Sequence, residues 1–363
     1  MMKLTSIKLI RTTVLAVILS SGVNAAFSQS AVTDEAELTK LRTAVEASPD
    51  SIKVHQAYIK AIGIKDPSLE KQYTLWTKKY PKSAMVPYAL GKAFINREDP
   101  KAKPWLLKTV AIDPKFAQAW SDLSIDSERW GEFTAGRDYM AKATAAAPSD
   151  PNYAFYHASS FSKVDEAKYR TLSMDVVKRF PNHERGAQAL YWLGSRARNT
   201  EDKIKYFELL HQSYAPEKFN WSASGMISYY NVLLGEQPEK ALKLAEEMAG
   251  YPKDEQQWTN FSNQAKLLTE AKKLIALKKG AAALALLNQI KLPRYFSFNK
   301  ELPVLKAEAN AIDGKNDAAY DSLIVAFAKS PAVKLKSIIG SYGSQLGKNE
   351  LQINADSWMP LPA

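Results

Sequence analysis

Prolines recur along this chain at a nearly constant interval. The separations between successive members of the series are 32, 33, 34, 33, 35, 36, 41 and 38 residues. The series consists of Pro49, Pro81, Pro114, Pro148, Pro181, Pro216, Pro252, Pro293 and Pro331. Proline cannot continue a helix, so each one ends a helix and sets the entry to the next. A period of about 34 residues fits one helix–turn–helix unit, and we therefore predict paired helices repeated along the chain.

Glycine and alanine recur at fixed offsets within this period. In two units a glycine is followed by alanine after twelve residues and by proline after seventeen. The two sets are Gly131, Ala143 and Pro148, and Gly314, Ala326 and Pro331, the second with an extra Ala319. Gly280 is followed by Ala285 after five residues, the same offset that separates Gly314 from Ala319. Glycine permits the left-handed turn at a helix end, and alanine lets two helices approach closely.

This pattern resembles the tetratricopeptide repeat (TPR), whose motif is carried here by Pro114, Trp120, Leu123, Gly131, Ala143 and Pro148. The resemblance implies an all-α solenoid with a right-handed superhelix over residues 34–340, followed by a tail at 341–363. The motif slips near residues 182–200 and 253–300, where we expect irregular repeats. A non-repetitive helical domain is the alternative. Residues 295–298 (YFSF) are the one candidate strand, and they are short.

The first 26 residues are predicted to be a cleaved signal peptide. Lys3, Lys8 and Arg11 precede a short apolar run at 12–20, and small residues follow at 23–25. The run is too short to cross a bilayer core of about 30 Å, so a membrane anchor is the weaker interpretation. We expect an exported protein, periplasmic or secreted, without a membrane span after cleavage. The absence of cysteine excludes a lipid-modified N-terminal cysteine.

The composition argues against several classes of chemistry. The chain has no cysteine, which excludes thiol nucleophiles, CysXXCys redox centres and thiolate zinc sites. The four histidines form no HisGluXXHis pair, and residues 340–349 (GSYGSQLGKN) miss the phosphate-loop spacing. We expect no catalytic residues, no cofactor and no metal. The net charge of +11 is dispersed among acids, so nucleic acid is not an expected partner.

A concave groove is the predicted binding surface for a protein or peptide partner. In a repeat of this kind, residues of the first helix of each unit line that groove. Offsets from the prolines select Tyr88, Lys92, Asn96, Ser121, Glu128, Phe155 and Ser159. The set lacks the Lys/Asn constellation with which chaperone-binding TPR proteins hold a terminal carboxylate.

Several stretches also resemble a narrower family. VPYALGKAF, DPKAKPWLLKTVAIDP, KRFPNHERGAQALYWLG and EKFNWSASGM are similar to the N-terminal helical region of bacterial envelope TlpA/thioredoxin-like thiol–disulfide oxidoreductases. That resemblance covers about residues 35–358 and implies a following thioredoxin-fold domain with CysXXCys. No cysteine is present to which the catalytic role can be assigned.

The sequence thus predicts a non-catalytic scaffold that mediates protein–protein interaction in the bacterial cell envelope. The alternative is a truncated or accessory member of the oxidoreductase family, either a paralogue without the redox domain or an interrupted gene. A carbohydrate-related or hydrolytic helical protein is a third hypothesis, which no motif favours.

Overall fold

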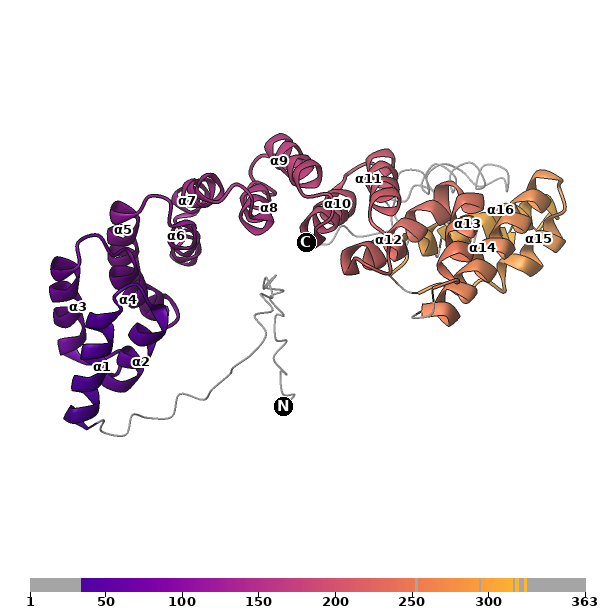
Figure 1. Ribbon diagram of the computed structural model, residues 1–363. Coiled ribbons are helices and arrows are strands. Elements are labelled where there is room, and N and C mark those ends of the chain that lie inside the picture. Colours follow the sequence, from indigo (N-terminus) through magenta and orange to yellow (C-terminus); the bar gives the residue numbers. More distant parts are fainter. Residues whose placement is uncertain (1–33, 252–253, 294, 316, 320–322, 325–363) are drawn as a thin grey trace, which may run out of the picture. The chain divides into compact units, whose positions relative to one another are not determined.

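A computed structural model describes residues 34–251, 254–293, 295–315, 317–319 and 323–324 (Figure 1). These residues form helices joined by turns and loops, and contain no strand. The all-α prediction is therefore confirmed for the described part of the chain. The helices divide into two compact units, Met1–Ile112 and Asp113–Ala363. None of the described helices combines the length and the apolar composition that a membrane crossing requires.

The first unit contains five described helices. They are α1 (Glu35–Ala47), α2 (Ile52–Ile62), α3 (Pro67–Lys79), α4 (Met85–Ile95) and α5 (Ala102–Ile112). Helix α3 illustrates how the local sequence sets a helix start. Asp66 accepts a hydrogen bond from the Ser68 backbone N–H at 2.8 Å, and Pro67 occupies the first turn, where no N–H is needed.

The second unit continues the same alternation of helix and turn. Its helices are α6 (Ala117–Arg129), α7 (Phe133–Ala146), α8 (Pro151–Ser159), α9 (Glu166–Arg179), α10 (Glu184–Arg196), α11 (Thr200–Ser213), α12 (Asn220–Glu236), α13 (Pro238–Met248), α14 (Glu255–Ala276), α15 (Gly280–Leu287) and α16 (Leu302–Ile312), with a 3-10 helix η2 (Ser297–Lys300) before α16. Within this unit each α-helix packs against the next one along the chain (Figure 1).

The periodic prolines lie where the sequence predicts them. Those within the described residues occupy the loops that precede α2, α4, α6, α8, α10, α12 and η2. Each even-numbered helix from α2 to α12 is therefore the first helix of a pair. Even-numbered helices also contact one another, α2 with α4, α8 with α10, α10 with α12 and α14 with α16. Paired helices of TPR-like length, stacked in sequence order, are the observed fold. The handedness of a superhelix stays a prediction.

Aromatic side chains fill the space between the helices. In the first unit, Tyr58, Tyr73 and Trp76 are at most 1% exposed, and the Trp76 ring lies 5.0 Å from that of Tyr58. In the second unit, Tyr230 stacks on Phe261 at 4.7 Å and donates a hydrogen bond to the Phe261 carbonyl at 2.7 Å. Large buried rings therefore make up much of the core of each unit.

The repeat predictions need three corrections. Gly131 and Gly314 do adopt positive φ, at 79° and 74°, but Gly280 is the first residue of α15 and packs closely against α16. The small buried residue after it is Ala283, at 0% exposure, whereas Ala285 is exposed. The YFSF stretch is not a strand: Ser297 and Phe298 begin η2, and Phe296 and Phe298 are buried in the core.

Expected irregularity is found in only one of the two regions. Helix α14 has 22 residues and α15 has 8, which accounts for the long proline spacing there. Helices α10 and α11 have 13 and 14 residues, the same as α6 and α7, so helix length is regular at 182–200, and an irregular superhelix there stays a prediction. The predicted signal peptide, the tail, Pro252, Ala326 and Pro331 lie outside the described residues.

Candidate partner-binding site

Arg185 of α10 is held against helix α8 by an unusually complete set of contacts. Its guanidinium lies 5.0 Å from the Phe155 ring centre and 4.9 Å from that of Tyr156. Its Nε donates to Asn152 Oδ1 at 2.9 Å and Nη2 donates to the Tyr156 hydroxyl at 2.9 Å, while Nη1 donates to Gln188. The side chain is half-buried, so its position is fixed while part of it still meets solvent.

A second group of aromatic rings joins α10 to α12. Trp192 and Tyr191 of α10 lie 5.7 and 4.9 Å from Trp221 of α12, measured between ring centres. Glu184 Oε1 accepts a hydrogen bond from the Trp221 backbone N–H at 2.8 Å and ties the start of α12 to α10. All three rings are half-buried. We call Tyr156, Arg185, Trp192 and Trp221 the ladder, because they follow one another over three even-numbered helices.

Helical periodicity explains why the ladder faces outward on α10. Arg185, Gln188, Trp192 and Arg196 are three, four and four residues apart, which places them on one face of a helix. The remaining face holds the small buried residues Gly186, Ala187 and Gly194 together with Leu190 and Leu193. One side of α10 therefore packs into the core, and the other carries Arg185, Trp192 and Arg196, with Gln188 on the same stripe but buried.

A cavity of about 440 Å³ lies beside the ladder. It is lined by residues 162–166 in and after the turn that leads into α9, by Tyr169 and Arg170 of α9, and by residues 193 and 196–198. We call it the turn cavity. Arg196 connects it to the ladder, since its guanidinium lies 5.7 Å from the Tyr169 ring centre and 5.1 Å from that of Trp192. Burial raises the pKa of the Tyr169 phenol, against the opposing charge of Arg196, so the phenol is neutral.

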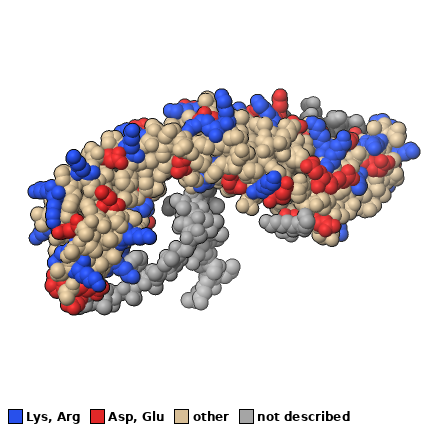
Figure 2. Space-filling model, in the orientation of Figure 1, with Lys and Arg blue, Asp and Glu red and all other residues tan. Residues whose placement is uncertain are grey.

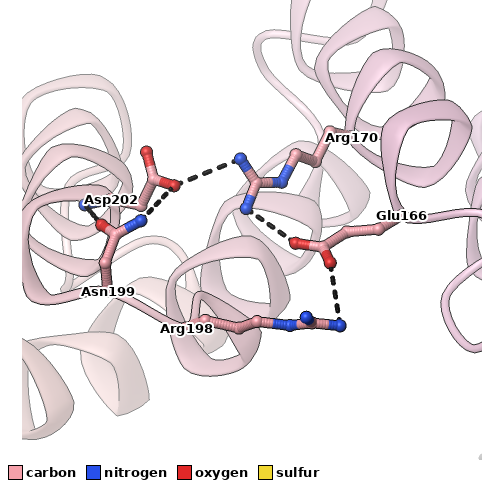
Figure 3. Close-up of polar contacts among 5 residues, drawn as sticks. All are labelled: Glu166, Arg170, Arg198, Asn199 and Asp202. Carbon is pink, nitrogen blue, oxygen red and sulfur yellow. Dashed lines mark hydrogen bonds and ion pairs between the residues drawn. The ribbon is translucent and has the colours of Figure 1, made fainter.

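A chain of charged groups braces one wall of the turn cavity (Figure 3). Arg170 lies between two acids, with Nη2 at 2.7 Å from Glu166 Oε1 and Nη1 at 3.2 Å from Asp202 Oδ2. The other oxygen of Glu166 is 3.3 Å from Arg198 Nη2. Asn199 caps α11 by accepting the Asp202 backbone N–H at 2.7 Å and donates to the Asp202 carboxylate at 3.1 Å. The network joins α9 to α11 across the turn that holds Arg198.

The histidines of the described chain have structural contacts. His55 is fully buried, His183 accepts from the Arg185 backbone N–H at the start of α10, and His211 lies 3.0 Å from Glu247. Burial lowers the pKa of His157, with Lys168 acting in the same direction. No group of three His, Asp or Glu side chains within the described residues is arranged to hold a metal ion.

The seven groove residues predicted from the sequence differ widely in their exposure. Three of them have covered side chains, Tyr88 at 7%, Ser121 at 6% and Phe155 at 6% exposure. Lys92 and Ser159 are half-buried, and Asn96 and Glu128 are exposed. Tyr88, Lys92 and Asn96 belong to α4 in the first unit, and the other four to α6 and α8 in the second. All seven lie on the first helix of a pair, as the repeat predicts, but offsets from proline did not separate covered from exposed positions.

Glu128 has one further property. Its side chain lies over Gly136 of α7, where an added Cβ would come within 2.9 Å of the Glu128 Cγ. Although the residue as a whole is exposed, partial desolvation of its carboxyl by the surrounding side chains raises the pKa of that group, and Arg137 opposes the effect. Phe155 contributes to the site indirectly, as the buried ring under Arg185.

Arg185, Trp192 and Trp221 were not among the residues predicted from the sequence. The signal for Arg185 and Trp192 is the polar and aromatic stripe on α10, which a proline-based offset does not test, whereas Trp221 lies on α12 outside that stripe. On the face shown in Figure 2, basic and acidic groups are interspersed, in agreement with the dispersed charge of the sequence.

Comparison with known proteins adds solved structures of low similarity. No protein-family model matches the chain, and no curated protein matches it. A crystal structure of MamA is 20% identical, with a TM-score of 0.34, and the match covers 40% of this chain and 87% of that one. A tetratricopeptide repeat protein from Parabacteroides merdae is 14% identical, with a TM-score of 0.35 and coverage of 74% and 98%. The P58(IPK) TPR domain is 13% identical, with a TM-score of 0.29 and coverage of 86% and 98%. Scores this low carry no argument about family or function.

Proposed function

We propose that this chain is an exported, non-catalytic scaffold of the bacterial cell envelope that binds a segment of a protein partner along the ladder. The observation that carries the proposal is the arrangement of Tyr156, Arg185, Trp192 and Trp221 over α8, α10 and α12. Tyrosine, tryptophan and arginine are the residue types that dominate binding energy at protein interfaces. Arg185 is already fixed by its contacts, so binding a partner costs little additional side-chain entropy.

The acids near the ladder and the turn cavity support a binding role. Glu166 and Asp202 are engaged by arginines, and Asp165 caps α9 by accepting the Lys168 backbone N–H at 2.9 Å. Carboxylates engaged in this way stabilise the local structure around the turn cavity.

Photo-crosslinking tests the ladder directly. A benzoylphenylalanine placed at Tyr156 is expected to form adducts with envelope proteins in intact cells, because its ring lies on the proposed contact surface. The matched control carries the same group at Lys178, an exposed position on the odd-numbered helix α9. Trp221→Ala should abolish the Tyr156 adducts while the helical circular dichroism is retained. Identical adduct patterns at both positions, or adducts that survive Trp221→Ala, contradict the proposal.

The export part of the proposal rests on residues 1–26 of the sequence. N-terminal sequencing of the protein isolated from its native host is expected to begin at Phe27. A chain that retains Met1, or that fractionates with the cytoplasm, would remove the envelope from the proposal and leave the scaffold role to be tested alone.

A second proposal follows the resemblance to TlpA/thioredoxin-like proteins, in which the chain serves a thiol–disulfide system as a truncated or accessory member. With no cysteine of its own, it would act by docking a substrate for a partner that supplies the CysXXCys. The purified chain should then reduce no disulfide in an insulin assay, but should raise the rate of a cysteine-containing partner. Adducts from Tyr156 that contain no thiol–disulfide protein argue against this second proposal.

A further inference from the structure

The turn cavity has cations without acidic partners. Within the described part of the chain, no carboxylate lies within ion-pair distance of Lys163 or Arg196. Lys163 is exposed, and Arg196, also exposed, rests on the Tyr169 and Trp192 rings. The acids at the cavity are already committed, Asp165 to the cap of α9 and Glu166 to two arginines. The cavity therefore presents positive charge that its own acids do not neutralise.

Arg198 adds a third available cation. Its side chain is 86% exposed, and its contact with Glu166 Oε2 is 3.3 Å long. Glu166 divides its charge between Arg198 and the shorter contact with Arg170. An exposed ion pair of this kind contributes little to stability, so a ligand carboxylate can compete for the guanidinium at little cost.

Large apolar side chains are exposed next to these cations. Val164, which lines the turn cavity, is 61% exposed. Trp130, which follows α6, is 51% exposed, and Phe133, the first residue of α7, is 60% exposed. The start of α7 lies near the turn before α9, because the guanidinium of Arg137, one helical turn after Phe133, lies 5.9 Å from the ring centre of Phe161 in that turn. Exposed apolar side chains grouped beside a charged rim are typical of an interaction surface.

We propose that the turn cavity, with Val164, Phe133 and Trp130 beside it, is a second docking site that binds an acidic segment of a protein partner. Carboxylates of the segment pair with Lys163, Arg196 and Arg198, and its apolar side chains cover Val164 and the two aromatic rings. A polyphosphate chain fits less well, since Asp165 and Glu166 border the cavity and repel closely spaced negative charges, and since a phosphate backbone offers nothing to the apolar side chains. The inference rests on the proposed function, from which it takes a protein segment as the ligand. It adds a second location, at the turn cavity, and a preference for acidic segments.

Fluorescence anisotropy with defined peptides tests this site on the full chain. The probe is a short fluorescein-labelled peptide in which Glu alternates with Leu and Phe, and its counterpart has Gln at every Glu position. We expect the Glu peptide to bind about tenfold more tightly than the Gln peptide. The difference should shrink as NaCl is raised from about 0.05 M to about 0.5 M, because salt screens exposed charges. Equal binding of the two peptides overturns the proposal.

A matched pair of variants separates the site from the overall positive charge of the chain. Lys163→Glu with Arg198→Glu reverses two cations at the turn cavity, and both side chains are exposed, so folding is preserved. Lys178→Glu with Lys243→Glu makes the same change in net charge on exposed positions of α9 and α13. The first pair should weaken binding of the Glu peptide about tenfold and the second less than about twofold. Equal losses in the two pairs show attraction by net charge alone and overturn the site.

The result also distinguishes this inference from the proposed function. If Trp221→Ala abolishes binding of the Glu peptide and the turn-cavity pair does not, the peptide binds the ladder and the inference is wrong while the scaffold role stands. If the turn-cavity pair abolishes binding while Tyr156 gives no specific adducts in cells, the acidic site stands and the ladder proposal fails. Displacement of the Glu peptide by inorganic phosphate at equal concentration would show an anion site without preference for a protein segment and would overturn the proposal.

Discussion

At the scale of single residues, His55 shows how burial couples a protonation state to folding. Its Nε2 is 2.8 Å from the Pro49 carbonyl, which can only accept, so Nε2 carries the hydrogen. Nδ1, at 3.0 Å from the Tyr73 hydroxyl, then accepts a hydrogen bond from Tyr73. Both ring nitrogens of the neutral imidazole therefore have hydrogen-bond partners. A second proton would bind Nδ1 and break the hydrogen bond that the Tyr73 hydroxyl donates to it.

We predict that the first unit loses stability in acid through His55. Burial lowers the pKa of the folded histidine, against smaller opposing effects of the Pro49 hydrogen bond and of Asp50. The unfolded chain, with a histidine pKa of about 6.5, therefore binds the proton first, and stability falls as pH drops below that value. Hydrogen-exchange protection of α2 and α3, corrected for intrinsic exchange, measures the loss. In His55→Gln this acid-dependent loss should be much smaller, and an unchanged loss contradicts the assignment.

Gly280 is a position where a single methyl group should matter. A Cβ built there would lie 2.3 Å from the Ala309 carbonyl oxygen of α16. The close approach lets Asp313 accept the Ala281 backbone N–H at 3.0 Å. Gly280→Ala should lower the free energy of unfolding by about 1–3 kcal/mol through overpacking.

Gly235→Ala is the matched control for that variant. Gly235 lies in α12, and the nearest atoms to a Cβ built there, from Glu301 and Phe298, are 3.6 Å away. Because alanine favours a helix over glycine, this change should stabilise by up to about 1 kcal/mol. Thermal or urea denaturation followed by circular dichroism measures the free energy of unfolding of both variants. Equal effects at the two sites would show that the contact between α15 and α16 leaves room for a methyl group at position 280.

At the scale of helices, one cap is connected to the ladder. Asp150 caps α8 by accepting the Asn152 backbone N–H at 2.7 Å, and it also accepts the Asn152 side-chain N–H at 3.0 Å. Asn152 in turn accepts from Arg185 Nε. The start of α8 therefore sets the amide that positions the guanidinium on α10.

We expect Asp150→Ala to lower stability by about 0.5–2 kcal/mol, the usual cost of losing a side-chain cap. It should also weaken partner binding at the ladder, because Asn152 loses one of its anchors. Asp150→Asn keeps an oxygen acceptor and should restore most of both properties. The two readouts are chemical denaturation and the yield of Tyr156 crosslinks. Full crosslinking in Asp150→Ala would mean that Arg185 is positioned without the cap.

At the scale of the whole molecule, stability should be local. Within the second unit each α-helix contacts its neighbours in sequence, and in several cases the next helix of the same parity. In such arrays a change in one unit is transmitted through nearest-neighbour contacts. We predict that Trp76→Ala, which empties a site that is 1% exposed, costs about 3–5 kcal/mol in the first unit.

Hydrogen exchange followed by mass spectrometry should show where that cost falls. Protection should drop in α1–α5 and remain near the original level in α12–α16. Tyr230→Ala is the reciprocal variant, since Tyr230 lies in the core of the second unit and is 0% exposed. A uniform loss of protection along the chain, in either variant, would show that the two units unfold as one.

The sequence predicted helix pairing better than it predicted the binding surface. Proline has a physical effect that does not depend on its surroundings, so the described members of the series fall in loops as expected. Exposure depends on partners that lie far away in the chain, which is why Tyr88, Ser121 and Phe155 are covered although their spacing selected them. The ladder depends on contacts between helices α8, α10 and α12, and only the stripe at 185, 188, 192 and 196 is visible in the sequence.

The packing of consecutive helices within the second unit also has a mechanical consequence. No disulfide cross-links the chain, since it has no cysteine, so a force applied at its ends meets the helix pairs one after another. Each pair that detaches releases a stretch of chain set by the proline spacing, roughly 100 Å when extended. Under tension the second unit should therefore lengthen in repeated steps of similar size, as an extensible tether whose stiffness is set by the weakest contact between neighbouring pairs.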